Sequence, residues 1–131
     1  STSKDTGALV VEGGLGVEGS IHAGNDIIAF SSSDATLKKD ITPIENALEM
    51  INKISGNTFT WNTGIQHLIP YENGTKDTGI LAQEVEALGL PGVTTTRGDG
   101  VKAVRYERLI PVLIEAVKEL TAKVKSLESN K

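Results

Sequence analysis

The chain has 131 residues, of which 38% are hydrophobic and only 4% aromatic, and its formal charge is -4. A chain of this length supports one small domain plus an additional segment, with a core built from isoleucine, leucine and valine. Thirteen basic residues against seventeen acidic ones give no electrostatic surface for nucleic acid, so we expect no nucleic-acid partner. The absence of cysteine excludes a disulfide framework and any thiolate metal site.

No apolar run approaches the roughly 20 residues that span a bilayer, and no basic amphipathic stretch suits a membrane surface. We therefore expect no membrane partner, and we expect no signal peptide in the sequence. So small a chain leaves much apolar surface uncovered, which makes association with further copies of itself an expectation.

Residues 9–28 repeat with a period of six, because apolar side chains recur in fixed phases with glycines between them. One phase consists of Leu9, Leu15, Ile21 and Ile27. Short periods of this kind are typical of β-solenoids and fibres, where glycine permits tight turns. About three copies cannot bury a core alone, so we predict the end of a β-helical fibre stalk that needs neighbouring chains. The alternative is a flexible glycine-rich linker.

An ordinary globular sequence follows the repeats, and it starts with the signature of a helix N-terminus. Thr42 suits an N-cap, Pro43 the first helical position and Glu45 the acid of a capping box. This pattern predicts a helix over about 43–54, which Gly56 would stop.

The middle of the chain indicates short strands joined by turns. Residues 57–62 alternate like a strand, and 63–78 resemble an exposed loop or hairpin insertion. Residues 79–90 predict a short strand that runs into a helix. Residues 93–106 predict a hairpin that turns at residues 98–100.

The last segment, about 106–128, predicts a long amphipathic helix. Apolar residues on alternating steps of three and four form a heptad seam: Ile110, Leu113, Val117, Leu120, Val124 and Leu127. Such a seam requires partner helices. Its β-branched and leucine positions favour a dimer, whereas the fibre-like segment favours a trimer. The predicted fold is thus α+β, with a stalk segment, a small mixed domain and a coiled-coil helix.

The strongest candidate for chemistry is a serine five residues before a lysine. With no cysteine and only two histidines, Ser33 and Lys38 are the most economical nucleophile and base in the sequence. Ser33 Oγ is held next to the carbonyl of Ser32 by its own backbone. Attack on that carbonyl would replace the amide by an ester, and hydrolysis would then cut the chain between Ser32 and Ser33.

Several readings of this site stay open. Residues five apart on an extended strand face opposite sides, so Ser33 and Lys38 meet only if the chain turns or if the lysine comes from a neighbouring protomer. Lys39 is the adjacent rival base, and Asp34 is a candidate supporting residue. The alternative without chemistry is a solvated linker with a local side-chain turn and surface lysines.

Five motifs occur in one order over residues 30–131 and together resemble a known family. They are Ser33-Asp34-x-x-Leu37-Lys38, Ala47-Leu48 with Ile51, Phe59-x-Trp61, Gly79-x-x-Ala82-Gln83-Glu84-Val85 and Val104-x-Tyr106-x-x-Leu109-Ile110-Pro111. The set resembles the intramolecular chaperone domain at the C-terminus of bacteriophage endosialidases, tail spikes and tail fibres. Many members carry arginine where this chain has Thr36.

The resemblance implies a homotrimer that folds the upstream stalk of its own polypeptide and then cuts itself off before Ser33. It implies a single-turnover serine autoprotease acting in cis, with Lys38 as base and neither metal nor cofactor. The domains would be residues 1–32, the stalk end, and 33–131, the chaperone. We expect a fibre precursor assembled in the host bacterial cytoplasm, with release of the chaperone. The alternative is a permanent structural or receptor-binding fibre tip without proteolysis.

Overall fold

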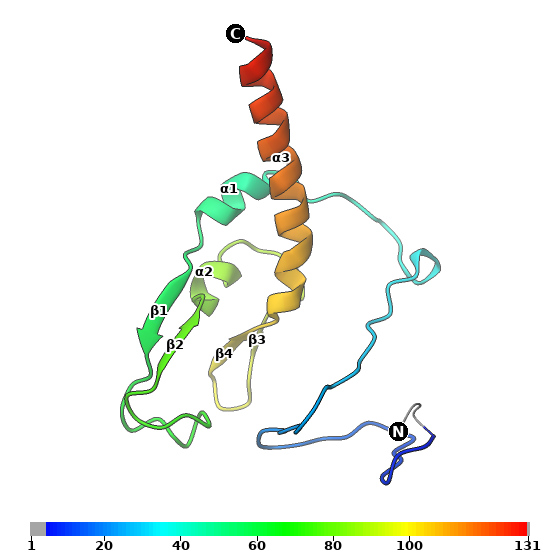
Figure 1. The fold of residues 1–131 in the computed structure, drawn as a ribbon, viewed down its shortest axis with the longest axis vertical. Helices are drawn as coiled ribbons and strands as arrows, with labels where there is room; N and C mark the ends of the chain where they lie inside the picture. Colours follow the sequence, from blue (N-terminus) through cyan, green and yellow to red (C-terminus); the bar gives the residue numbers. More distant parts are fainter. Residues whose placement is uncertain (1–4, 131) are drawn as a thin grey trace. The chain divides into compact units, whose positions relative to one another are not determined.

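The computed structural model describes residues 5–130, and the chain divides into two compact units, Ser1–Ser32 and Ser33–Lys131. Residues 1–4 and 131, which the predicted domains include at their outer ends, lie outside the described residues. In the first unit, residues 5–32 form neither helix nor strand; they are the blue trace in Figure 1.

The six-residue repeat of the first unit leaves its apolar side chains in water. The four residues that share the first phase are between 64% and 76% exposed: Leu9, Leu15, Ile21 and Ile27. A single chain therefore buries none of this pattern. The β-helical stalk stays a prediction that depends on neighbouring chains.

The second unit is a small mixed α+β domain with a long C-terminal helix, which confirms that part of the predicted fold class. The elements in chain order are η1 (Ala35–Leu37), α1 (Ala47–Asn52), β1 (Asn57–Thr60), β2 (Lys76–Gly79), α2 (Ala82–Glu86), β3 (Thr94–Thr96), β4 (Lys102–Val104), η2 (Tyr106–Leu109) and α3 (Ile110–Ser129). The four strands form two separate antiparallel hairpins, β1–β2 and β3–β4.

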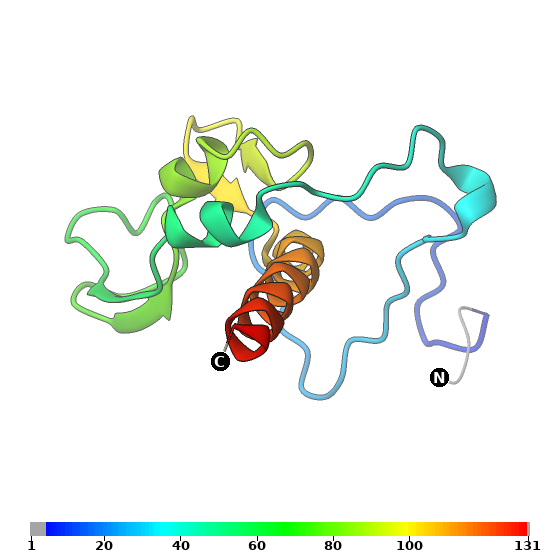
Figure 2. The same ribbon diagram turned by 90° about the horizontal axis from the view of Figure 1, so that it is seen from above.

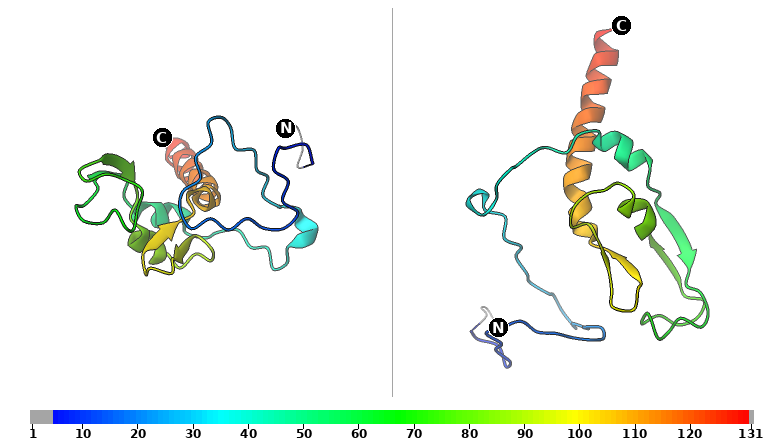
Figure 3. Two further views of the ribbon diagram at one scale, coloured as in Figure 1. Left: turned by 90° about the horizontal axis from the view of Figure 1, so that it is seen from below. Right: turned by 180° about the vertical axis from the view of Figure 1, so that it is seen from behind.

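The core lies where α1 and α2 meet the first half of α3. Helix α1 packs against α3, and α2 packs beside the β3–β4 hairpin (Figures 1 and 2). The buried side chains are small and aliphatic: Ala47, Val85, Val93, Leu109, Val112 and Ala116. The C-terminal turns of α3 extend beyond α1, as the view from behind in Figure 3 shows. Residues 121–130 are exposed.

Helix α1 begins later than the sequence predicts, and the predicted capping box at Thr42 and Glu45 is wrong. Asn46 takes a left-handed conformation with φ 56°, so helical geometry starts only at Ala47. The cap comes from another helix instead, because Glu119 Oε2 of α3 accepts the Leu48 N–H at 2.7 Å. A tertiary contact therefore replaces the expected local one.

The strand predicted over 57–62 is present as the shorter β1, and the hairpin predicted over 93–106 is confirmed as β3–β4. The strand predicted at the start of 79–90 is wrong, because β2 ends at Gly79 and lies almost wholly within the predicted 63–78 insertion, whereas the helix predicted in 79–90 is present as α2. Asn57 pairs with Gly79 and Thr60 with Lys76, so the insertion between them is an exposed loop that closes on strand β2. Within that hairpin, Trp61 stacks on the ring of Tyr71, with centroids 4.9 Å apart. The β3–β4 hairpin turns over the predicted residues 98–100.

A close contact joins β2 to the start of η2. The Ile80 N–H donates to the hydroxyl of Tyr106 at 3.1 Å. A Cβ at position 79 would lie 2.6 Å from that hydroxyl, so a residue larger than glycine would require the Tyr106 side chain to shift. The close contact at Gly79 is thus made by a side chain 27 positions further along the chain.

Helix α3 presents two different apolar faces. Leu109, just before it, and Val112 and Ala116 face the core and are buried. The predicted heptad seam lies on another face, and its six residues are between 45% and 68% exposed. The helix is confirmed, whereas its coiled-coil role stays a prediction. No helix within residues 5–130 is long and apolar enough to cross a membrane.

Candidate active site

The candidate site is built on one turn of 3-10 helix at the start of the second unit. Asp34 is extended and acts as the N-cap of η1. Its Oδ1 accepts the backbone N–H of Thr36 at 2.8 Å and the Thr36 hydroxyl at 2.7 Å. The turn is closed by the Leu37 N–H donating to the Asp34 carbonyl at 3.0 Å and the Lys38 N–H donating to the Ala35 carbonyl at 3.1 Å.

This turn brings the predicted nucleophile and base together within one chain. Lys38 Nζ donates a hydrogen bond to Ser33 Oγ at 2.7 Å. Of the two arrangements that the sequence leaves open, the chain turn is therefore the one observed, and no neighbouring protomer is needed for the contact. Both residues are exposed.

The neighbouring candidates lie differently. Lys39, the rival base, makes no hydrogen bond or ion pair among the residues that the structure describes. Asp34 is engaged by Thr36 and not by either lysine. The Thr36 hydroxyl, followed by its backbone N–H, lowers the pKa of the Asp34 carboxyl below its usual value. The Asp34 carboxylate is thus directed at Thr36, within the turn.

The chemistry open to this arrangement is intramolecular acyl transfer. A serine hydroxyl is a weak nucleophile until a base removes its proton, and a lysine can do so only as the neutral amine. Burial or nearby positive charge disfavours the ammonium form of a lysine. The described turn holds the two groups in hydrogen-bond contact but leaves Lys38 exposed. The contact between the two side chains is therefore present in the single chain, whereas burial of the Lys38 amine is not.

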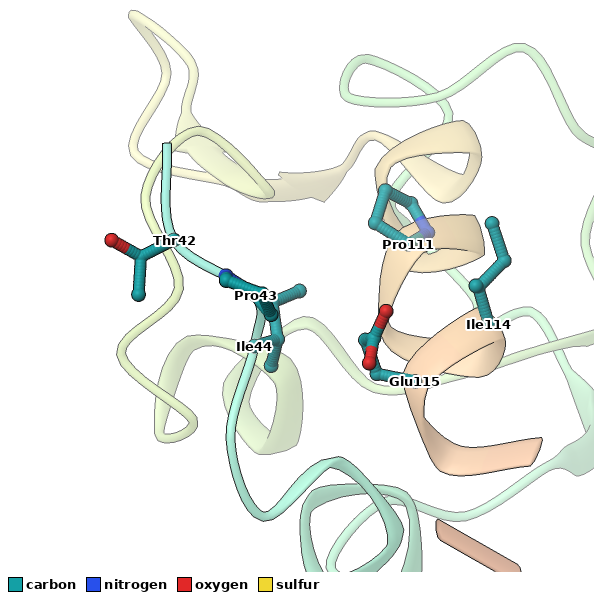
Figure 4. A pocket seen from close by; sticks show the side chains of 6 residues that line it. All are labelled: Thr42, Pro43, Ile44, Pro111, Ile114 and Glu115. Atoms are coloured by element: carbon teal, nitrogen blue, oxygen red, sulfur yellow. The ribbon is translucent and has the colours of Figure 1, made fainter. Parts of the chain in front are cut away.

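A shallow groove lies further along the segment that follows the turn. Thr42, Pro43 and Ile44 line a space of about 280 Å³ together with Pro111, Ile114 and Glu115 of α3, and the Thr42 side chain points away from α3 (Figure 4). The only ionisable side chain here is Glu115, which pairs with Lys118 at 3.1 Å. The groove lies between this segment and α3, and its lining offers no second pair of a nucleophile and a base.

Sequence reasoning missed the part of Thr36 and the cap that Glu119 provides for α1. An aspartate two residues before a threonine is typical of a side-chain turn, so the first signal was present in the sequence. The second contact joins residues 71 positions apart, and no local pattern indicates it. Within residues 5–130 no group of three or more histidine, aspartate or glutamate side chains gathers as a metal site would require.

Comparison with known proteins matches the same part of the chain. Residues 33–95 match the family described as chaperone of endosialidase. The chain is 35% identical over 103 residues to the long tail fiber protein Gp37 of Enterobacteria phage K3 and, over the same length, to that of Enterobacteria phage T2. These matches cover 76% of this chain but only 8% and 7% of the two fibre proteins.

A third relative extends the match. The Gp37 protein of Escherichia phage AR1 is 32% identical over 128 residues, which is 87% of this chain and 11% of that protein. The chain therefore spans about a tenth of the length of the curated relatives that it matches. The family match begins at Ser33, the residue at which the second unit begins. Residues 33–95, which hold the Ser33–Lys38 pair, belong to the chaperone of endosialidase family.

Proposed function

We propose that this chain is the end of a phage tail fibre, in which residues 33–131 act as an intramolecular chaperone that releases itself by cutting between Ser32 and Ser33. The observation that carries the proposal is the 2.7 Å hydrogen bond from Lys38 Nζ to Ser33 Oγ. It lies at the first residue of the family match. The tail-fibre assignment draws on the names of the relatives.

The proposed reaction uses atoms of the chain and one water molecule. Lys38 Nζ takes the proton of Ser33 Oγ as the oxygen attacks the carbonyl carbon of Ser32. The bond from that carbon to the Ser33 nitrogen breaks, the nitrogen takes the proton, and an ester joins the two residues. Water then hydrolyses the ester, leaving a carboxylate on Ser32 and a free amine and hydroxyl on Ser33.

Assembly would supply the burial that this chemistry needs. Leu37 and Ile41, on either side of the lysines, are 71% and 69% exposed. A neighbouring protomer packed on them would exclude water from Lys38 and so favour its neutral form. Cleavage would then report correct assembly, which suits a chaperone that leaves only after its work is complete.

The exposed seam of α3 supports an assembly of several chains, and the fibre-like segment together with the family resemblance favours three of them. Six apolar side chains at heptad spacing lie in water in the single chain, whereas a different face of the helix packs on α1. The apolar phase of residues 9–28 is exposed in the same way. Three chains held in register by the helices could bury both patterns. We place this assembly in the host bacterial cytoplasm, before the fibre joins the virion.

Two pairs of variants test the proposed reaction in the full chain. Ser33→Ala should stop cleavage while the trimer stays folded, and Ser32→Ala, which keeps the proposed nucleophile, should still be cut. Lys38→Ala should slow cleavage by about 10²-fold or more, as expected for loss of a general base, while Lys39→Ala should have a much smaller effect.

The measurement is the intact mass of each chain over time after folding. Continued cleavage before residue 33 in Ser33→Ala would exclude Ser33 as the nucleophile. Equal losses in the two lysine variants would leave neither lysine as the specific base and would contradict the assignment of Lys38.

A further inference from the structure

Resting on the proposed function, we infer that Asp34 and Thr36 are positioning residues, which together hold the amine of Lys38 on the hydroxyl of Ser33. The inference starts from a geometric need. Along an extended chain, the side chains of residues 33 and 38 would point to opposite faces and lie far apart. The backbone between them must therefore bend. The family resemblance does not indicate which residue makes the bend in this chain, because Thr36 stands where many members carry arginine.

The bend is made by one carboxylate oxygen with two donors. Asp34 Oδ1 accepts both the N–H and the hydroxyl of Thr36, and this side-chain turn places Ala35–Leu37 in a single 3-10 turn. The backbone of Lys38 leaves that turn extended, with φ -123° and ψ 147°. Its side chain then returns to Ser33 Oγ. The contact between the pair is thus a consequence of the Asp34–Thr36 turn.

No other part of the described chain shares this task. Among residues 5–130, none outside 33–38 forms a hydrogen bond or ion pair with the side chains of Ser33, Asp34, Thr36 or Lys38. A 3-10 turn of three residues is marginal in water by itself. The two Thr36 bonds therefore reinforce the two backbone bonds that close the turn.

Asp34 acts through geometry and not through its charge on the lysine. The carboxylate is directed at Thr36, and no ion pair joins it to Lys38 in the described residues. An uncharged acceptor of the same shape should therefore replace it. This distinguishes positioning from electrostatic support, in which the negative charge itself would matter.

The test compares truncating and conservative variants of the full chain by cleavage rate. Misplacement of a catalytic group by about 1 Å can cost about 10²-fold, so we expect a loss of that order in Asp34→Ala. Thr36→Val keeps the backbone donor and should lose about tenfold. Asp34→Asn and Thr36→Ser keep the acceptor and the hydroxyl, and they should recover most of the rate with an unchanged pH profile. Thr42→Val, a nearby exposed threonine, is the matched control.

A second measurement is independent of cleavage. In the uncut chain kept at pH 5, where amine-catalysed cleavage is slow, a nuclear Overhauser effect between Ser33 Hβ and Lys38 Hε protons reports the contact directly. It should be present in the wild type and in Asp34→Asn and lost in Asp34→Ala. If the wild type shows the effect but is never cut, the proposed function fails and the positioning stands.

Two results would overturn the inference. One is an Asp34→Ala chain that keeps both the contact and the rate. The other is an Asp34→Asn chain that loses as much rate as Asp34→Ala or shifts the pH profile, because the charge and not the turn would then be what Asp34 contributes.

Discussion

The two units of this chain both carry regular apolar patterns, but only one of them folds those patterns into a core. Residues 33–131 bury Val85 and Val112 almost completely, using α1, α2 and the first half of α3. Residues 9–28 repeat apolar side chains every six positions, yet these side chains stay in water, and no strand forms within residues 5–32.

The difference follows from how many neighbours each pattern needs to satisfy its backbone and bury its apolar side chains. Helices such as α1 and α3 satisfy their own backbone hydrogen bonds and need one neighbour to cover one face. A six-residue β repeat satisfies neither its backbone nor its apolar phase without adjacent coils or chains. The exposed seam on α3 resembles the second kind, because its six apolar side chains are uncovered in the single chain.

The largest expected effect tests that shared dependence on assembly. Leu120→Asp places a carboxylate at the centre of the seam, so burying it between helices becomes unfavourable and the trimer should fall to monomers. The same variant should be uncut, although Ser33 and Lys38 are unchanged. Light scattering measures the first result and intact mass the second.

Ser126→Asp is the control for that variant, since it adds the same charge at an exposed position outside the seam. It should remain trimeric and be cut. A trimeric Leu120→Asp chain would mean that α3 does not hold the chains together.

A smaller effect should distinguish a crowded position of the second unit from an open position of the same unit. Gly79→Ala places a Cβ 2.6 Å from the Tyr106 hydroxyl and should lower the free energy of unfolding by about 1–3 kcal/mol. Gly56→Ala, where nothing lies within 4 Å, should change it by less than about 0.5 kcal/mol. Urea unfolding followed by circular dichroism measures both. Equal stability of the two variants would show that the Tyr106 contact does not constrain strand β2.

The smallest effect concerns the contact between α1 and α3. Glu119→Ala removes the acceptor of the Leu48 N–H, and loss of such a cap should cost about 1 kcal/mol. Glu119→Gln keeps an acceptor oxygen and should cost less. Glu128→Ala, at an exposed position near the end of α3, serves as the control in the same unfolding measurement. A Glu119→Ala chain as stable as this control would contradict the capping role.

Local sequence patterns predicted much of the second unit. They failed where a residue distant in the sequence determines the local structure. The long C-terminal helix and the turn at residues 98–100 follow from spacing and turn chemistry, and both are present. The start of α1 was predicted wrongly because its cap comes from Glu119, and the closeness of Gly79 to Tyr106 had no local signal.

The candidate site was predictable to a similar extent. Ser33 and Lys38 follow from the need for a nucleophile and a base, and whether the chain turned between them stayed open. Asp34 and Thr36 decide that question locally. The burial that would activate Lys38 depends on surfaces outside a single chain, so neither the sequence nor the fold of one protomer supplies it.

The central claim is that the folded, assembled chain cuts itself before Ser33. Its most direct test is intact mass spectrometry of the 131-residue chain after trimer formation, beside Ser33→Ala prepared in the same way. We predict that the wild type yields fragments 1–32 and 33–131 while Ser33→Ala stays whole. A wild-type trimer that keeps its full mass as long as the Ser33→Ala trimer does would contradict the account.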